Sequence, residues 1–202
     1  VRVFTLYGPL SRDLDTSMSG YAGPVTRLGV RGVPLVLHAI SWWLLRRPLV
    51  SLRCLGVLFR RWRSWETAGE AFLSVCCGFA FARLFQAQGV QLIHADWANG
   101  PATAAWTASR LTGLPFSFTG RAGDIFPPDG ALREKGRDCC ALRTDVARNV
   151  PYLVEHAAVP RHKVRLIHAA LALDVHEPAR PALVPPFRLL AVGRFVPKKG
   201  YD

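Results

Sequence analysis

The sequence lacks the cysteine spacing that a disulfide framework or a structural zinc site requires. Its five cysteines, an odd number, form two adjacent pairs and no Cys-x-x-Cys motif; they are Cys54, Cys76, Cys77, Cys139 and Cys140. Small disulfide-stabilised domains and cysteine-based zinc sites are therefore not indicated. We expect no metal site and a reducing, cytoplasmic location. The adjacent pair Cys76 and Cys77 is expected to pack in the core and not to react.

Acidic residues are scarce. Lys and Arg together number 26 against 14 Asp and Glu, which gives a formal net charge of +12, carried mostly by arginine. This balance favours anionic partners, namely nucleic acid, phosphorylated substrates or an anionic membrane surface. The alternative is that the arginine-rich composition is a genome-wide tendency without functional meaning. Because no nucleic-acid-recognition module and no basic strip interleaved with aromatics occurs, nucleic acid is not an expected partner.

The most apolar segment, 33–63, lacks an uninterrupted membrane-spanning run. Arg46, Arg47, Pro48 and Arg53 interrupt it before the roughly 20 apolar residues that a span needs. The pattern predicts two helices that break near Pro48. A basic segment with tryptophans favours binding to an anionic membrane surface, which would place the protein peripherally on the inner face of the cell membrane. The alternative is a pair of core helices with solvated arginines at their ends.

Short apolar strands alternate with helices along the rest of the chain. We predict strands at 1–7, 92–94, 114–119, 140–143, 164–168 and 188–192, and helices at 66–88, 102–111 and 146–156. This alternation predicts an α/β fold with a Rossmann-like parallel sheet flanked by helices. A proline-rich linker at 177–186 predicts a boundary between a first domain, 1–176, and the start of a second, 187–202. We recognise no signal peptide at the start of the sequence, and we expect both ends to be truncated.

Ligands of such sheets bind at the carboxyl ends of the strands. Four segments follow predicted strands, at 94–97, 120–124, 168–170 and 193–200. The first two bring His94, Asp96, Arg121 and Asp124, and we expect Asp96, Arg121 and Asp124 to cluster at one edge of the sheet. The last segment joins a glycine to several cations, which suits a diphosphate, but a solvated basic turn would have the same composition.

Three stretches carry longer motifs. They are LIHADWANGPATAAWTASRLTGLPFSFTGRAGDIF, KVRLIHAALALDV and LLAVGRFVPKKGYD. In order and spacing, from about Leu92 to Asp202, they resemble the retaining, family-four bacterial glycosyltransferases of the GT-B type. Before Leu92 the resemblance is diffuse, and the first strand of that family, with its glycine-rich loop, is not recognised.

The resemblance implies a function and a domain assignment. Residues 1–176 would form the acceptor-side domain, and 187–202 would begin the nucleotide-sugar-binding domain. The activity would be hexosyl transfer from a nucleotide sugar to a lipid-linked or polysaccharide acceptor, in cell-envelope or exopolysaccharide biosynthesis, with no cofactor and no required metal. Gly193, Arg194 and Lys199 match the donor-phosphate motif of the family.

On the acceptor side, this sequence matches the family's motif at some positions and departs from it at others. Asp124 matches the end of the family's acceptor motif, and His94 matches the first histidine of a pair whose second position is Asp96 here. Arg121 stands where the family has its active-site histidine. Arg121 and Asp124 are thus the candidate catalytic residues, and His94 and Asp96 are candidate acceptor-side residues. An arginine stays protonated at neutral pH and cannot perform the acid–base work of a histidine.

Two further departures concern residues nearer the carboxyl end. Ala170 and Ala172 replace a glycine and an aspartate of the family, and its acidic Glu-x7-Glu motif does not occur in these 202 residues. We therefore expect the 202-residue chain to be inactive alone. The alternative function is that of a diverged or truncated, non-catalytic relative that binds only the membrane surface or the acceptor.

Overall fold

The computed structural model describes residues 1–7, 23–60, 65–121, 123–126 and 131–169, with the single positions 187, 190, 192, 193 and 200. The side chains of 60 and 65–68 are not described. The chain divides into two compact units, Val1–Ala169 and Ala170–Asp202. All described helices and strands belong to the first unit.

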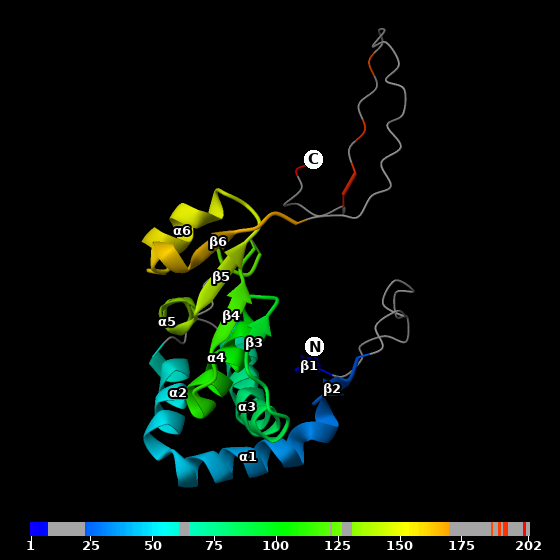
Figure 1. The fold of residues 1–202 in the computed structure, drawn as a ribbon, viewed down its shortest axis with the longest axis vertical. Coiled ribbons are helices and arrows are strands. Elements are labelled where there is room, and N and C mark those ends of the chain that lie inside the picture. The colour runs from blue at the N-terminus through cyan, green and yellow to red at the C-terminus, as the bar shows by residue number, and fades with distance from the viewer. Residues whose placement is uncertain are drawn as a thin grey trace. The chain divides into compact units, whose positions relative to one another are not determined.

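Four parallel strands form the main sheet of the first unit. They are β3 (Ile93–Ala95), β4 (Phe116–Thr119), β5 (Ala141–Thr144) and β6 (Val164–Leu166), in the order β3-β4-β5-β6 (Figure 1). Parallel neighbours require crossovers, and these contain α4 (Gly100–Thr112), α5 (Leu132–Asp138), and α6 (Asn149–Glu155) with the short 3-10 helix η3 (Arg161–Lys163). The predicted α/β class and Rossmann-like parallel sheet are confirmed.

Side chains alternate between the two faces of this sheet, as strand geometry requires. On β4 the rings of Phe116 and Phe118 are buried and stack with centroids 6.1 Å apart, whereas Ser117 between them lies on the other face and is half-buried. Leu142 on β5 and Val164 on β6 pair in register with the same buried face. The core of the unit therefore lies on the Phe116–Phe118 side of the sheet.

The long helix α3 (Trp65–Ala87) packs closely against α4. At Gly78 an added Cβ would lie 2.6 Å from Thr107 Cβ and 2.8 Å from the backbone oxygen of Ala104, so the two helix backbones approach as closely as glycine allows. Beyond the helix, Gly113 (φ 81°) ends α4 in the left-handed conformation that favours glycine.

Among the described residues one helical stretch, Gly69–Ala87, is long and apolar enough to cross a membrane by length and composition. A buried core helix passes the same test, and just over half of this stretch is buried inside the protein. The predicted helix at 66–88 is confirmed, but its burial is incomplete. Phe72 and Leu73, in its first half, are exposed.

Two helices that meet at a corner in Figure 1 precede α3: α1 (Val33–Arg46), entered through the 3-10 helix η2 (Val30–Gly32), and α2 (Pro48–Arg60). The predicted break at Pro48 is confirmed. Arg47 leaves the helical region (φ −139°, ψ 62°), because the residue before a proline is biased away from it, and Pro48 is tolerated as the first residue of the next helix. From α1, the indole Nε1 of Trp43 donates to the Phe79 carbonyl of α3.

The boundaries of the strands in the main sheet differ from prediction by at most two residues, and the predicted strand at 1–7 is shorter. It is β1 (Val3–Thr5), paired in parallel with β2 (Val25–Arg27), which was not predicted. The predicted helix at 146–156 begins at Asn149. We did not predict α5, because its charged sequence LREKGRD has no apolar period. Most of the predicted strand at 188–192 lies outside the described residues.

Candidate functional site

A polar residue follows each strand of the main sheet at its carboxyl end. The four are Asp96 after β3, Arg121 after β4, Asp145 after β5 and His168 after β6. Successive members are in contact, so together they form a polar row along the edge. The row is the candidate site, at the place where parallel α/β sheets bind their ligands.

The guanidinium of Arg121 is the centre of the row. Its Nη2 lies 3.2 Å from Asp96 Oδ1, and its Nε lies 3.8 Å from Asp145 Oδ2. Its Cζ also lies 4.6 Å from the centroid of the Trp97 ring, within the range of a cation–π contact. Arg121 is 30% exposed and Asp96 64% exposed, so the cluster opens to solvent.

His168 extends the row through the backbone. Its Nδ1 lies 2.8 Å from the carbonyl oxygen of Asp145. A carbonyl only accepts hydrogen bonds, so Nδ1 must carry the proton and donate it. In the neutral ring, Nε2 is then the nitrogen with a lone pair. His168 is exposed, and Nε2 is a group that can accept a proton at this edge.

Asp124 lies beneath the row and not in it. One carboxylate oxygen accepts the amide of Ala98 at 2.7 Å, the other accepts the amide of Arg121 at 2.7 Å, and the side chain is buried. The predicted proximity of Asp96 and Arg121 is confirmed, and Asp124 contacts Arg121 through its backbone amide. Both oxygens of Asp124 already serve the backbone, so this residue links the loops that carry Asp96 and Arg121.

A buried lysine holds the same loop from the opposite side. Lys135 on α5 is fully buried, and its ammonium donates to the Ala98 carbonyl and, at 3.1 Å, to Thr103 Oγ1. The backbone N–H of Ala98 thus donates to the buried carboxylate of Asp124, and its carbonyl accepts from the buried ammonium of Lys135. Asp124, Ala98 and Lys135, which we name the Ala98 clamp, fix the loop bearing Asp96 and Trp97.

His94 lies elsewhere. It is within β3, where its Nδ1 is 2.8 Å from Ser117 Oγ and its Nε2 is 3.3 Å from Thr119 Oγ1, both on β4. None of its described contacts reaches Arg121. The ring nitrogens are occupied by neighbouring hydroxyls of β4, and no described contact joins His94 to the other candidate acceptor-side residue, Asp96.

The predicted donor-side residues fall in the second unit. Gly193 is an exposed bend, whereas Arg194 and Lys199 lie outside the described residues. No geometry supports or opposes their predicted role. Within the described ranges, no group of three His, Cys, Asp or Glu side chains is placed to hold a metal ion.

Sequence reasoning missed Asp145, and it named His168 only as part of a loop. Asp145 follows a predicted strand and His168 ends one, so the rule that led to Asp96 and Arg121 would have found them. Chemically, the row offers two carboxylates as acceptors, one guanidinium as donor and a histidine, and the ring of Trp97 lies against the guanidinium. This set suits a polyhydroxylated ligand, with the carboxylates and the guanidinium binding hydroxyls.

The cysteines carry no chemistry at this site. Burial raises the pKa of Cys54 to about 12 and the pKa values of Cys77 and Cys139 to about 11, and it also raises the pKa of Cys76. A buried thiol with a raised pKa is a poor nucleophile. This supports the expectation that Cys76 and Cys77 pack in the core.

Alkylation should therefore distinguish one cysteine from the other four. Cys140 is the exposed one. We expect iodoacetamide to modify one thiol rapidly in the native protein, because a pKa of about 11 leaves about one thiolate per thousand thiols at pH 8. Mass spectrometry over time measures this. The variant Cys140→Ser should lose the fast phase, and rapid modification of two or more sites would contradict the burial described here.

Compared with known proteins, the chain matches no protein-family model and no curated protein.

Proposed function

We propose that the first unit is the acceptor-binding domain of a GT-B-type glycosyltransferase, and that the polar row binds the saccharide part of the acceptor. The observation that carries the proposal is the contact between residues that follow adjacent parallel strands, Asp96, Arg121 and Asp145. The row lies where such folds bind ligands. The motifs around it also resemble those of the glycosyltransferases named above.

The charge of the row favours a sugar over a phosphate. Two carboxylates lie within 4 Å of the single guanidinium, at 3.2 and 3.8 Å. A phosphate placed on Arg121 would lie close to both carboxylates and be repelled. Sugar hydroxyls, in contrast, donate to carboxylates and accept from a guanidinium without adding charge. The ring of Trp97 is 46% exposed and adds an apolar surface for a sugar ring.

In this proposal His168 is the proton acceptor. With Nδ1 held by the Asp145 carbonyl, Nε2 is free to accept the proton of an acceptor hydroxyl bound to the row. His168 follows β6, two strands away from β4, and it would supply the acid–base capacity that the family's histidine has at the position of Arg121. The donor, a nucleotide sugar, would contact Gly193, Arg194 and Lys199, as the resemblance implies. Transfer would proceed with retention and without a required metal.

Binding of simple glycosides tests the acceptor role. Octyl glucoside, galactoside, mannoside and N-acetylglucosaminide are titrated separately into the 202-residue chain and observed by saturation-transfer difference NMR, below their micelle-forming concentrations. We expect saturation of the sugar protons of at least one. Arg121→Gln should weaken that binding about tenfold to a hundredfold, since one charge-assisted hydrogen bond contributes about 1.5–3 kcal/mol.

Arg161→Gln is the matched control. Arg161 belongs to η3, which precedes β6 and so lies toward the amino end of that strand, away from the row. Its removal changes the net charge by the same amount and should leave binding unchanged. Equal loss in both variants, or saturation confined to octyl protons in the wild type, would contradict the acceptor role.

The second candidate function is acceptor binding without transfer. It is favoured by Arg121, an arginine held in two ion pairs at the position of the family's histidine. Radiolabelled UDP-, GDP- and dTDP-sugars, incubated with the 202-residue chain and the bound glycoside, test for turnover, which would exclude the second candidate. We expect no transfer and no hydrolysis from these 202 residues alone. Turnover would place the donor site within them.

A further inference from the structure

We propose that the outer face of α1 and α2 docks onto an anionic lipid bilayer, with leucines entering the interface and arginines binding lipid phosphates. The sequence already favours membrane binding by 33–63. The structure now assigns the residues that make the contact. The proposal does not rest on the glycosyltransferase function, because it uses a different part of the first unit (Figure 1).

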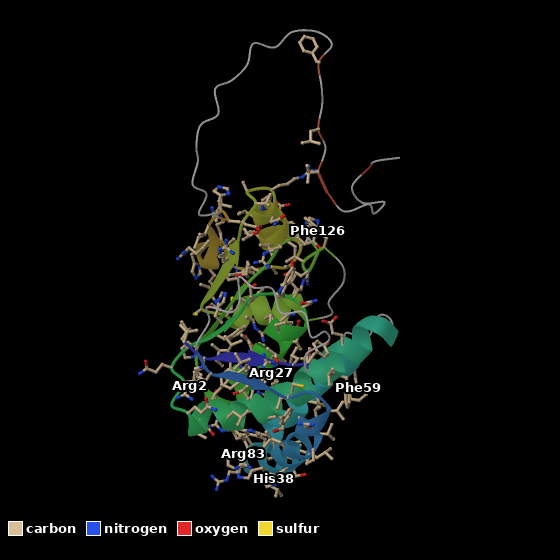
Figure 2. All side chains as sticks on the ribbon, turned by 90° about the vertical axis from the view of Figure 1, so that its right-hand side faces the viewer. Arg2, Arg27, His38, Phe59, Arg83 and Phe126 are labelled. Carbon is tan, nitrogen blue, oxygen red and sulfur yellow. The ribbon has the colours of Figure 1, made fainter. Side chains whose placement is uncertain are left out.

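α2 has two apolar sides. Cys54 and Val57 face inward and are buried. Leu49, Leu52 and Phe59 recur at helical spacing on the opposite side, and they are 71%, 57% and 73% exposed. The Phe59 side chain lies at the outer surface in Figure 2. A helix that is apolar on its exposed side as well as on its buried side has an unpartnered surface.

α1 continues this surface. Its buried side carries Ala39 and Trp43, and its opposite side exposes Leu37 and Leu45, which are 61% and 85% exposed. The two helices meet at Pro48, so Leu45 and Leu49 flank the corner between them. We name the exposed residues Leu37, Leu45, Leu49, Leu52 and Phe59 the apolar ridge.

The charge around the ridge has one sign. From Thr16 to Trp65 the sequence contains eight arginines and no aspartate, glutamate or lysine. Arg46, Arg47 and Arg53 are exposed beside the ridge leucines. None of the three forms an ion pair with any residue that the structure describes. Their charge is therefore available to an external anion.

A pair of arginines also lies at one ring, on the side of α1 that faces α3. The Cζ atoms of Arg46 on α1 and Arg83 on α3 lie 4.7 and 4.8 Å from the centroid of the Trp42 ring. Arg83 also lacks an ion-pair partner among the described residues. Two guanidiniums at a single ring repel each other, and a phosphate near both would reduce that repulsion.

A bilayer surface fits this combination better than a second copy of the chain. Two copies facing each other through the ridge would bring arginines against arginines. The headgroup region instead offers phosphates beside acyl chains, and it receives apolar side chains and the long stems of arginines together. An anionic bilayer is therefore the occupant to which we commit.

Flotation with vesicles tests this. The 202-residue chain is mixed with vesicles of phosphatidylcholine alone or of phosphatidylcholine with phosphatidylglycerol, at low and high salt. We expect much stronger binding to the anionic vesicles, weakened by salt. Arg47→Gln/Arg53→Gln should reduce the partition coefficient about thirtyfold, since each basic residue near an anionic surface contributes about fivefold. Arg133→Gln/Arg148→Gln removes two other exposed arginines and should change it little.

The ridge has its own variant pair. Leu49→Ser/Leu52→Ser should reduce binding at least about tenfold, because two apolar side chains no longer enter the interface. Leu92→Ser/Ile167→Ser, at similarly exposed positions outside the ridge, should bind as the wild type does. Light scattering of each variant reports the oligomeric state. Equal binding to neutral and anionic vesicles at low salt would overturn the proposal. So would a ridge variant that alters self-association and leaves flotation unchanged.

Discussion

Replacing Gly78 with alanine is expected to lower the free energy of unfolding by about 2–3 kcal/mol, the cost of overpacking a close contact. The added methyl would lie 2.6 Å from Thr107 Cβ and 2.8 Å from the backbone oxygen of Ala104. The oxygen belongs to α4 and cannot rotate away, so the two helices would have to separate. Urea unfolding followed by circular dichroism gives the change.

Gly69→Ala, in the same helix, is the matched control with the opposite sign. An added Cβ at Gly69 meets no atom within 4 Å. Alanine should therefore stabilise the protein by about 0.5–1 kcal/mol through its better helix propensity. If both variants shift stability in the same direction, the close approach of α3 and α4 is wrong.

Replacing the acid of the Ala98 clamp is expected to cause the second large loss in the free energy of unfolding. In Asp124→Ala, the amides of Ala98 and Arg121 both lose a partner at 2.7 Å, the first in a buried place and the second in a partly buried one. Each unsatisfied amide costs about 1–3 kcal/mol, so we expect about 2–6 kcal/mol of destabilisation. Asp124→Asn retains one acceptor oxygen, so its free energy of unfolding should lie between those of the wild type and Asp124→Ala. Chemical denaturation of both variants measures the series.

Asp96→Ala serves as the control for the clamp. Asp96 is an exposed carboxylate that pairs with the same arginine, and exposed ion pairs contribute less than about 1 kcal/mol. Hydrogen exchange adds a local readout. The Ala98 amide should exchange slowly in the wild type and in Asp96→Ala, and quickly in Asp124→Ala. A small stability loss in Asp124→Ala, with Ala98 still protected, would refute the clamp.

The sheet was predictable because each strand carries its own local signal. In Phe116–Thr119 the alternation of phenylalanine with small polar residues fixes which side faces the core, and a small-residue helix, 102–111, precedes it. The break before Pro48 follows from proline chemistry alone. Strand ends were less predictable, because ladder pairing with a neighbour decides where a strand stops.

The candidate site was predictable in its position but not in its contacts. Asp96 and Arg121 follow strands, and parallel topology alone brings such residues to one edge. That Asp124 lies beneath this edge, with both oxygens on backbone amides, depends on how two loops close over it. The burial of Lys135 had no sequence signal either, since α5 reads as a charged, solvated turn. The close contact at Gly78 likewise depends on how α3 meets α4.

The most direct test of the acceptor site is a map of amide chemical shifts. The ¹⁵N-labelled 202-residue chain is titrated with the octyl glycoside that binds best. We expect the largest shifts at the four loops of the polar row, at and around Asp96, Arg121, Asp145 and His168, with little change on α1 and α2. Saturating shifts confined to the apolar ridge, or no shifts at the row for any glycoside, would contradict the account.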